Sequence, residues 1–423
     1  MKRRTLLALG GLGALGLVGY RFWPDEGIWN PCRSPLPEHL RRHELVQAAF
    51  AGIDPAQLWD THVHLVGVGD GGSGIWVTPA MDSLLRPMQY VQKRFYLNAG
   101  CAGGPQIDTA YVERLMQLQD DFPPGARLML LAFDYHYDDT AARREDLSSF
   151  HTPNAYALAL AQRFPRRFIA IASIHPYRPD AIEQLQAAAA QGARAIKWLP
   201  PAMGMDPASP KCDRFYEALA RLRLPLLTHA GEELAVHGGD AQAFGNPLRL
   251  RRALDHGVTV IVAHCASLGN GVDLDKGPNG PSVPNFELFA RLMNDRRYEG
   301  RIYGEISAIT QLNRLGAPLD TLLERSEWHA RLLNGSDYPL PAVMPIFSLK
   351  IMVARGYLRA TEAQVLSEIR QYNALLFDFV LKRSIARHGK RLASAVFESR
   401  RLFDTIGSRI DPLTRKTASG GVL

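Results

Sequence analysis

The sequence predicts an α/β protein, a (β/α)8 TIM barrel with an N-terminal export or anchor segment and a basic C-terminal helical extension. Three observations lead to this prediction. Eight short apolar segments recur along the chain, segments with helical spacing lie between them, and polar side chains stand where several apolar segments end. Strands that alternate with helices are typical of a parallel sheet, and eight such units are the number that closes a barrel.

The eight predicted strands are short and mostly apolar. They cover residues 58–64, 127–133, 168–174, 194–199, 225–229, 259–264, 301–306 and 331–337. Between them, apolar positions recur every three or four residues, as in segments 180–190, 213–222 and 247–255. A doubly wound sheet that binds a dinucleotide is the rival fold. It lacks support, because no Gly-x-Gly-x-x-Gly motif opens a helix after the first strand.

The first predicted strand ends in a His-x-His motif, His62 and His64. Side chains alternate along a strand, so both imidazoles point to the same face and can form half of a metal site.

Later predicted strands also have polar residues at their carboxyl ends, namely Lys197, His229, His264 and Asp337. The active site of a (β/α)8 barrel lies at this end of the strands, where residues distant in sequence converge. Each residue alone has an ordinary structural explanation, such as a helix cap. All six in this order favour a metal site.

This pattern of strand-end residues resembles the amidohydrolase superfamily. Residues 335–339 (Gly-Ser-Asp-Tyr-Pro) and 373–377 (Asn-Ala-Leu-Leu-Phe) look like its amidohydrolase-related (type 2) branch. The resemblance covers roughly residues 56–380. It implies a centre with one or two divalent ions, zinc being the expected metal.

In the two-ion form that the resemblance implies, His62, His64 and Asp337 bind the first ion. His229 and His264 bind the second ion.

The resemblance also implies that a carbamate on Lys197 bridges the two ions. The presence of Lys197 favours a centre with two ions, because a bridging ligand has no role when only one ion is bound. The alternative is a cationic lysine that pairs with a carboxylate such as Glu305 or binds substrate. In single-metal members of the branch, the strand-six histidine, here His264, is an acid/base instead of a ligand.

A divalent ion bound by imidazole and carboxylate ligands would activate a water molecule, so the predicted metal site indicates a hydrolase. Such an ion lowers the pKa of its water from about 15.7 to roughly 7, and Asp337 is expected to accept the water's proton. The predicted substrate is a small amide, lactone or ester. Two alternatives stay open: a single-metal decarboxylase of an aromatic or unsaturated carboxylic acid, with His264 as acid/base, and a non-catalytic barrel that binds a small carboxylate.

Loops that follow the strands are expected to form the substrate-binding wall. The expected substrate-binding residues are Trp198, His175 and Glu233. A structural role is the alternative for His175.

The composition fits one barrel with appendages: 423 residues, 46% hydrophobic and 22% charged. The net charge of +7 comes from the two ends, because residues 381–423 hold ten Lys and Arg against three Asp and Glu, and residues 1–50 hold seven against four. The barrel is therefore mildly acidic, and nucleic-acid binding is not predicted. The expected partner is a small-molecule substrate, and a homo-oligomer is an open possibility.

Residues 1–23 are predicted to be a twin-arginine-like signal or a membrane anchor. Lys2, Arg3 and Arg4 precede an apolar, glycine-containing stretch that is short for a spanning helix. The protein is therefore expected to be exported, either periplasmic or anchored and facing the periplasm. Residues 24–55 are predicted as a linker and N-terminal extension, 56–380 as the barrel, and 381–423 as the C-terminal extension.

Four cysteines could form up to two disulfides in an oxidising compartment, with three alternative pairings. They are Cys32, Cys101, Cys212 and Cys265.

Overall fold

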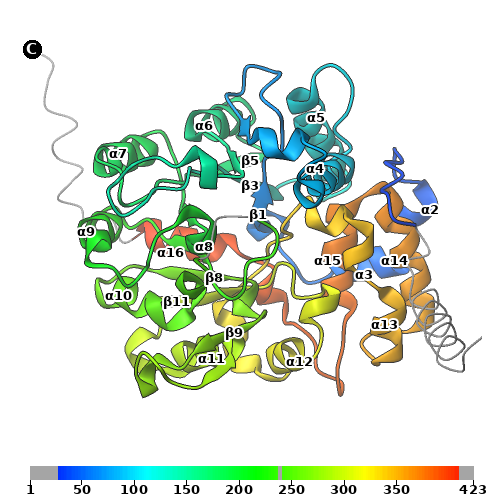
Figure 1. The fold of residues 1–423 in the computed structure, drawn as a ribbon. Coiled ribbons are helices and arrows are strands. Elements are labelled where there is room, and N and C mark those ends of the chain that lie inside the picture. Colours follow the sequence, from blue (N-terminus) through cyan, green and yellow to red (C-terminus); the bar gives the residue numbers. More distant parts are fainter. Residues whose placement is uncertain (1–26, 237–240, 409–423) are drawn as a thin grey trace, which may run out of the picture.

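The computed structural model describes residues 27–236 and 241–408, and eight parallel strands form its centre (Figure 1). The strands are β1 (Trp59–His64), β3 (Arg127–Leu131), β5 (Phe168–Ile171), β6 (Ile196–Trp198), β7 (Leu226–His229), β8 (Val260–Ala263), β11 (Ile302–Glu305) and β12 (Leu332–Leu333). Each lies within one of the eight ranges predicted from the sequence, so the α/β class and the strand order are confirmed.

The eight strands are hydrogen-bonded as two parallel sheets, in the orders β1-β3-β5 and β12-β11-β8-β7-β6. The two ladders do not join into one continuous ring. Single parallel bridges lie between them, Ala172 with Ile196 on one side and Val63 with Tyr338 on the other. The backbone N–H of Asp337 also donates to the His62 carbonyl at 2.8 Å, which ties the end of β12 to β1.

Alternate residues of the strands pack into a separate apolar cluster between the two sheets. Its members are Trp59, Met129, Leu131, Ile169, Ile171, Ala195, Leu227, Ile261, Ala263, Leu333, Leu402 and Phe403. Lys197 comes two residues after Ala195, and His229 comes two residues after Leu227. Because side chains alternate along a strand, these two polar side chains share the inward face with the apolar cluster. The polar ends of the strands therefore lie directly above an apolar interior.

Helices surround the strands (Figure 1). They include α4 (Pro87–Ala99), α5 (Ile107–Gln119), α6 (Asn154–Arg163), α7 (Ala181–Ala190), α9 (Asp213–Leu222), α10 (Arg251–Asp255), α11 (Asn285–Asn294), α12 (Ala317–Glu324), α13 (Leu349–Ala354), α14 (Ala360–Tyr372) and α15 (Ala374–Ser384). Helix α9 buries Phe215, Tyr216 and Leu219, the recurring apolar positions that predict it. Two short antiparallel pairs complete the fold: β2 (Trp76–Val77) with β4 (Phe150–His151), and β9 (Asn270–Val272) with β10 (Ser282–Pro284).

The described parts of the two predicted extensions pack onto the barrel helices and strands. Helix α3 (Glu44–Phe50) contacts α15, where the Phe50 and Phe379 rings stack with centroids 4.7 Å apart. Helix α16 (Arg400–Ser408) contributes Leu402 and Phe403 to the interior cluster. The predicted boundary at residue 380 falls inside α15. Residues 1–23 lie outside the described residues. In the part of the chain that is described, no helix is long and apolar enough to cross a membrane.

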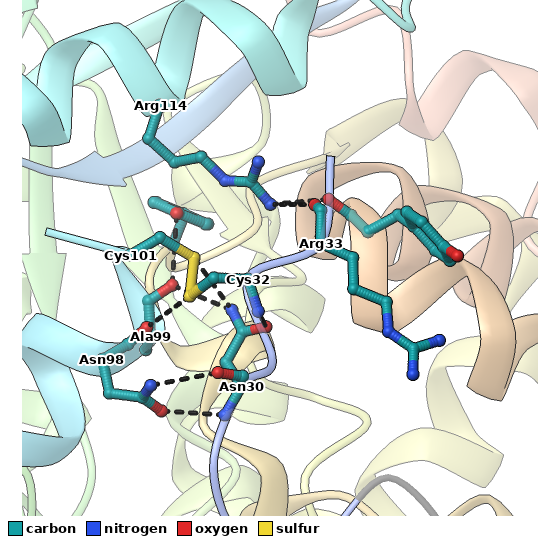
Figure 2. Close-up of a disulfide and its surroundings, with 9 residues drawn as sticks. Asn30, Cys32, Arg33, Asn98, Ala99, Cys101 and Arg114 are labelled. Atoms are coloured by element: carbon teal, nitrogen blue, oxygen red, sulfur yellow. Dashed lines mark hydrogen bonds between the residues drawn. A yellow bond between two sulfur atoms is a disulfide. The ribbon is translucent and has the colours of Figure 1, made fainter. Parts of the chain in front are cut away.

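One disulfide joins Cys32 to Cys101 (Figure 2). Cys212 and Cys265 are buried and free. One of the two disulfides that four cysteines allow is therefore formed, and it links the N-terminal extension to the residues after α4.

Candidate metal centre

All six predicted metal-site residues line one cavity at the carboxyl ends of the strands. Strand β1 supplies His62 and His64, β6 and β7 supply one residue each, and the turns after β8 and β12 supply the last two. The full set is His62, His64, Lys197, His229, His264 and Asp337.

The Asp337 carboxylate lies among three imidazoles. Oδ1 is 3.4 Å from His62 Nε2 and 3.1 Å from His64 Nε2, and Oδ2 is 3.8 Å from His264 Nε2. One ligand atom each from His62, His264 and Asp337 lie within 4.8 Å of one another, close enough to share an ion. The carboxylate and imidazoles are the ligand types that zinc and similar divalent ions bind.

The backbone at two of these residues is unusual. His264 has a φ of 55° and Asp337 a φ of 59°, in the left-handed region that a non-glycine residue rarely adopts. Such conformations cost of order 1–3 kcal/mol each and cluster at functional sites. Here they turn the chain sharply at the ends of β8 and β12, and both side chains reach the cavity.

The buried Glu305 carboxylate orients His62. Its Oε2 is 2.9 Å from His62 Nδ1 and accepts a hydrogen bond from Ser307 Oγ at 2.6 Å. Burial raises the pKa of Glu305 to about 7, against the hydrogen bonds from Ser307 that lower it. A carboxylate at Nδ1 leaves Nε2 free to face an ion. Glu305 was expected only as an alternative partner of Lys197, and its contact with His62 was not predicted, although Glu305 stands near the end of a predicted strand as the six expected residues do.

Lys197 is buried beside His62, with its Nζ 3.2 Å from His62 Nε2. Burial lowers the pKa of Lys197 to about 8, although the charges of Asp337, Glu305 and Glu233 raise it. A neutral amine, the form that reacts with carbon dioxide, is therefore accessible near neutral pH. Among the described residues, Glu305 pairs with His62 rather than with Lys197.

His229 provides the test of whether a metal fits. Both of its ring nitrogens are buried, and neither has a hydrogen-bond partner in the described chain. The nearest carboxylate oxygen, Oε2 of Glu233, is 3.4 Å from Nδ1. Burial lowers the pKa of His229 to about 3, so the imidazole is neutral at neutral pH. A buried nitrogen without a partner is costly, and a divalent ion would satisfy it. The donor set therefore fits a metal.

Of the three expected substrate-binding residues, Glu233 lines the cavity and the other two do not. Trp198 points into the helix layer, where its ring packs on Phe215 and Nε1 donates to the Ile174 carbonyl at 2.8 Å. It follows Lys197 in β6, and consecutive strand residues face opposite sides. His175 is fully buried, and its Nε2 is 2.9 Å from the Met203 carbonyl. This placement matches the structural role that was the alternative expectation for His175.

Glu233 has its carboxylate turned toward its own loop. Its Oε1 accepts a hydrogen bond from the backbone N–H of Val236 at 2.8 Å and another from Ala235. Burial raises the pKa of Glu233 to about 7, although these hydrogen bonds lower it. Glu233 is therefore placed to shape the loop around His229.

Arg314 is a cavity residue that the sequence analysis did not identify. It is buried, and within the described ranges no carboxylate lies within 4.0 Å of its guanidinium. Its Nη1 donates to Ser267 Oγ at 3.0 Å. Burial lowers the pKa of Arg314, although the more distant Asp337 and Glu233 raise it. A buried cation without an ion pair is costly, so this wall of the cavity favours an anionic group.

Comparisons with known proteins give structural likenesses and one family match. An uncharacterized TIM-barrel protein from Bordetella bronchiseptica is 16% identical, with 83% of this chain and 99% of that chain covered and a TM-score of 0.47. A probable 2-pyrone-4,6-dicarboxylic acid hydrolase from Acinetobacter baumannii is 16% identical (67% and 84% covered, TM-score 0.41). A 2,6-dihydroxybenzoate decarboxylase from Rhizobium is 14% identical (82% and 98% covered, TM-score 0.41).

No curated protein matches the sequence significantly. A family model described as Amidohydrolase matches residues 59–375. That range includes every strand that supplies a residue to the cavity.

Proposed function

Because the chain belongs to the amidohydrolase family, we propose that it is a metal-dependent hydrolase that uses an activated water on a small amide, lactone or ester. The family consists of metal-dependent enzymes. The observation that supports a metal in this chain most directly is His229, whose two buried ring nitrogens have no hydrogen-bond partner in the described residues. We expect zinc, as one or two ions.

We further propose that the eight strands act as one closed (β/α)8 barrel. The single bridges at both edges of the two sheets support this, together with the hydrogen bond from Asp337 to the His62 carbonyl. Closure would hold residues from β1 and β12 at a constant separation.

A divalent ion, when bound, lowers the pKa of the attacking water and polarises the substrate carbonyl. Asp337 lies within 3.1–3.8 Å of three imidazoles, so its carboxylate can orient that water and accept its proton. The same side chain can then donate the proton to the leaving group. His264 is held by Ser307, whose Oγ is 2.7 Å from Nδ1, which directs Nε2 toward the cavity.

Asp337→Asn tests this proposal. Asn keeps the size of the side chain and an oxygen ligand but cannot accept a proton. We expect the variant to fold, to keep at least one ion, and to lose on the order of 10²–10⁴ in turnover. Substrates would be found by screening amides, lactones, esters and aromatic carboxylic acids. A metal-loaded variant with turnover close to that of wild type would leave Asp337 as a ligand only.

Arg314 favours a second candidate function, decarboxylation of an aromatic or unsaturated carboxylic acid. Its buried guanidinium supports a carboxylate-bearing substrate, and every substrate of a decarboxylase carries that group. The same screen distinguishes the two functions: release of carbon dioxide by wild type, with no turnover of amides, lactones or esters, would favour the decarboxylase. Arg314→Met should raise KM for acidic substrates and leave KM for neutral esters nearly unchanged, with the exposed Arg296→Met as the control.

A further inference from the structure

We propose that the exposed apolar face of α4 and the segment before it docks on a lipid bilayer. This face consists of Ile28, Trp29, Leu84, Leu85, Met88 and Val91. The inference concerns where the protein sits and does not depend on which reaction it catalyses.

The side chains of this apolar face are among the most exposed large apolar residues in the described chain. Leu84 is 76% exposed, Leu85 90% and Met88 82%. Single exposed apolar residues are ordinary on protein surfaces, whereas a cluster of large ones marks an interaction site.

Apolar residues of α4 form a stripe along one side of the helix. Met88, Val91 and Phe95 follow one another at spacings of three and four residues along α4, which places them on the same side of the helix. The Trp29 ring stacks on Phe95 with centroids 4.6 Å apart, and so extends the stripe to the N-terminal segment. Leu84 and Leu85 are also exposed and stand just before the start of the helix.

The N-terminal segment is fixed to the carboxyl-terminal end of α4, where Asn30 and Cys32 lie beside Asn98 and Cys101 (Figure 2). The Cys32–Cys101 disulfide joins the segment to the residues that follow the helix. Asn30 N–H donates to Asn98 Oδ1 at 2.8 Å, and Asn98 Nδ2 donates to the Asn30 carbonyl at 3.0 Å. The chain therefore leaves the described structure at Gly27, next to the apolar face.

What precedes Gly27 in the sequence identifies the bilayer as the partner. Lys2, Arg3 and Arg4 are followed by the apolar stretch of residues 5–20, which the sequence predicts as an export signal or anchor. A retained anchor attached at this point would bring the apolar face to the membrane surface. An apolar face beside such an anchor would add its own buried apolar area to membrane binding.

The charges around the face also fit a bilayer with anionic lipids. Arg86 directly precedes α4 and Arg94 lies on it; both are exposed, and basic residues beside apolar ones favour anionic headgroups. Within the described residues, Asp82 in the turn before α4 is an acidic residue close to the face, and it is paired with Lys93 at 2.7 Å. Trp29, with an apolar ring and a polar N–H, suits the interface between headgroups and acyl chains.

Docking in this way would place the cavity close to the membrane. Met81, Lys93, Tyr96 and Leu97, from the same helix and the turn before it, line the cavity. Substrate would then enter beside the bilayer surface.

The test uses the full chain and a fluorophore that reports polarity, attached to Met88→Cys or, in a second protein, Leu85→Cys. Cys212 and Cys265 are buried and the other two cysteines are paired, so the label should react at the new site. The matched control is Val272→Cys, an exposed apolar position on β9. Vesicles of phosphatidylethanolamine and phosphatidylglycerol are added, and binding is checked by sedimentation.

We expect the labels at 85 and 88 to shift to the blue and to become protected from aqueous iodide when vesicles are added. The label at 272 should do neither. Protein that sediments with vesicles while the labels at 85 and 88 stay in water, or that does not sediment at all, would overturn the proposal. A blue shift without vesicles would also overturn the proposal. A shift that disappears on dilution would indicate that a second copy of the chain covers the face. A shift that persists on dilution would indicate that residues 1–26 of the same chain cover it.

Discussion

Glu305 Oε2 lies 2.9 Å from His62 Nδ1, and the His62 side chain is 1% exposed and the Glu305 side chain 0%. The pair fixes the tautomer of a buried imidazole, because a carboxylate that accepts a hydrogen bond from Nδ1–H keeps the proton on Nδ1 and leaves the lone pair on Nε2. Nε2 is the nitrogen that faces Asp337, at 3.4 Å.

Glu305→Gln tests this orientation. The Gln amide can donate to Nδ1 and so move the proton of His62 to Nε2, where it would oppose metal binding. We expect metal affinity to fall about 10–100-fold, measured by competition with a chelator. The control is Glu327→Gln at the surface. Unchanged affinity in the Glu305 variant would mean that the carboxylate does not set the tautomer.

Gly335→Ala should disturb the same pair. A Cβ at this position would lie 2.7 Å from His62 Cβ and would also contact the Glu305 carboxylate. Both neighbours are buried and cannot move freely, so we expect a loss of roughly 1–3 kcal/mol in the free energy of unfolding and a weaker metal site. Gly103→Ala is the matched control, since its Cβ would meet no atom within 4 Å. Equal stability of the two variants in urea would contradict the expectation.

His175 should make the fold sensitive to acid. Burial lowers its pKa to about 3, from an ordinary value of 6.5. The unfolded chain therefore binds a proton below about pH 6.5 that the folded chain does not bind until about pH 3, and the free energy of unfolding falls as the pH is lowered through this window. His175→Asn removes this group, so the free energy of unfolding of the variant should fall less steeply as the pH is lowered. The two slopes should differ by about one proton, or ~1.4 kcal/mol per pH unit. Equal slopes in urea titrations between these pH values would contradict this assignment.

Lys197 should become carbamylated when bicarbonate is supplied. Its pKa of about 8 leaves part of the amine neutral near neutral pH. We expect a carbamate signal from 13C-labelled bicarbonate, and loss of the second ion and of activity in Lys197→Ala. A short carboxylic acid such as acetate should partly restore both by replacing the carbamate. An unmodified amine with a single ion in bicarbonate would favour the single-metal form.

The strands and the site were predictable because they follow from local rules. Each of the eight strands lies within a short, mostly apolar segment, and each expected metal-site residue lies near the carboxyl end of a strand or within four residues after it, where barrel geometry brings residues together. Lys197 and Trp198 show that the alternation of side chains along a strand could also have been used to choose among the expected substrate-binding residues. They are neighbours in β6 and must face opposite sides, so placing Lys197 in the cavity already excludes Trp198.

Arg314 and the hydrogen bonds of His175 could not be predicted in this way. Arg314 lies in the loop after β11, and its approach to the cavity depends on how that loop packs, which no periodicity encodes. His175 follows β5, and the direction of its ring is set by contacts with Met203 on a different segment. The disulfide pairing likewise depends on where residues 27–37 pack, since four cysteines allow three pairings.

The metal content of the purified protein tests the account's central claim most directly. His62 and His64 lie on one strand above the apolar interior, so replacing both by Ala should remove ligands without unfolding the protein. Elemental analysis should find one or two divalent ions per chain in wild type and loss of the more tightly held ion, with loss of activity, in His62→Ala/His64→Ala. A wild-type protein without metal, or a folded double variant with full metal content, would contradict the account.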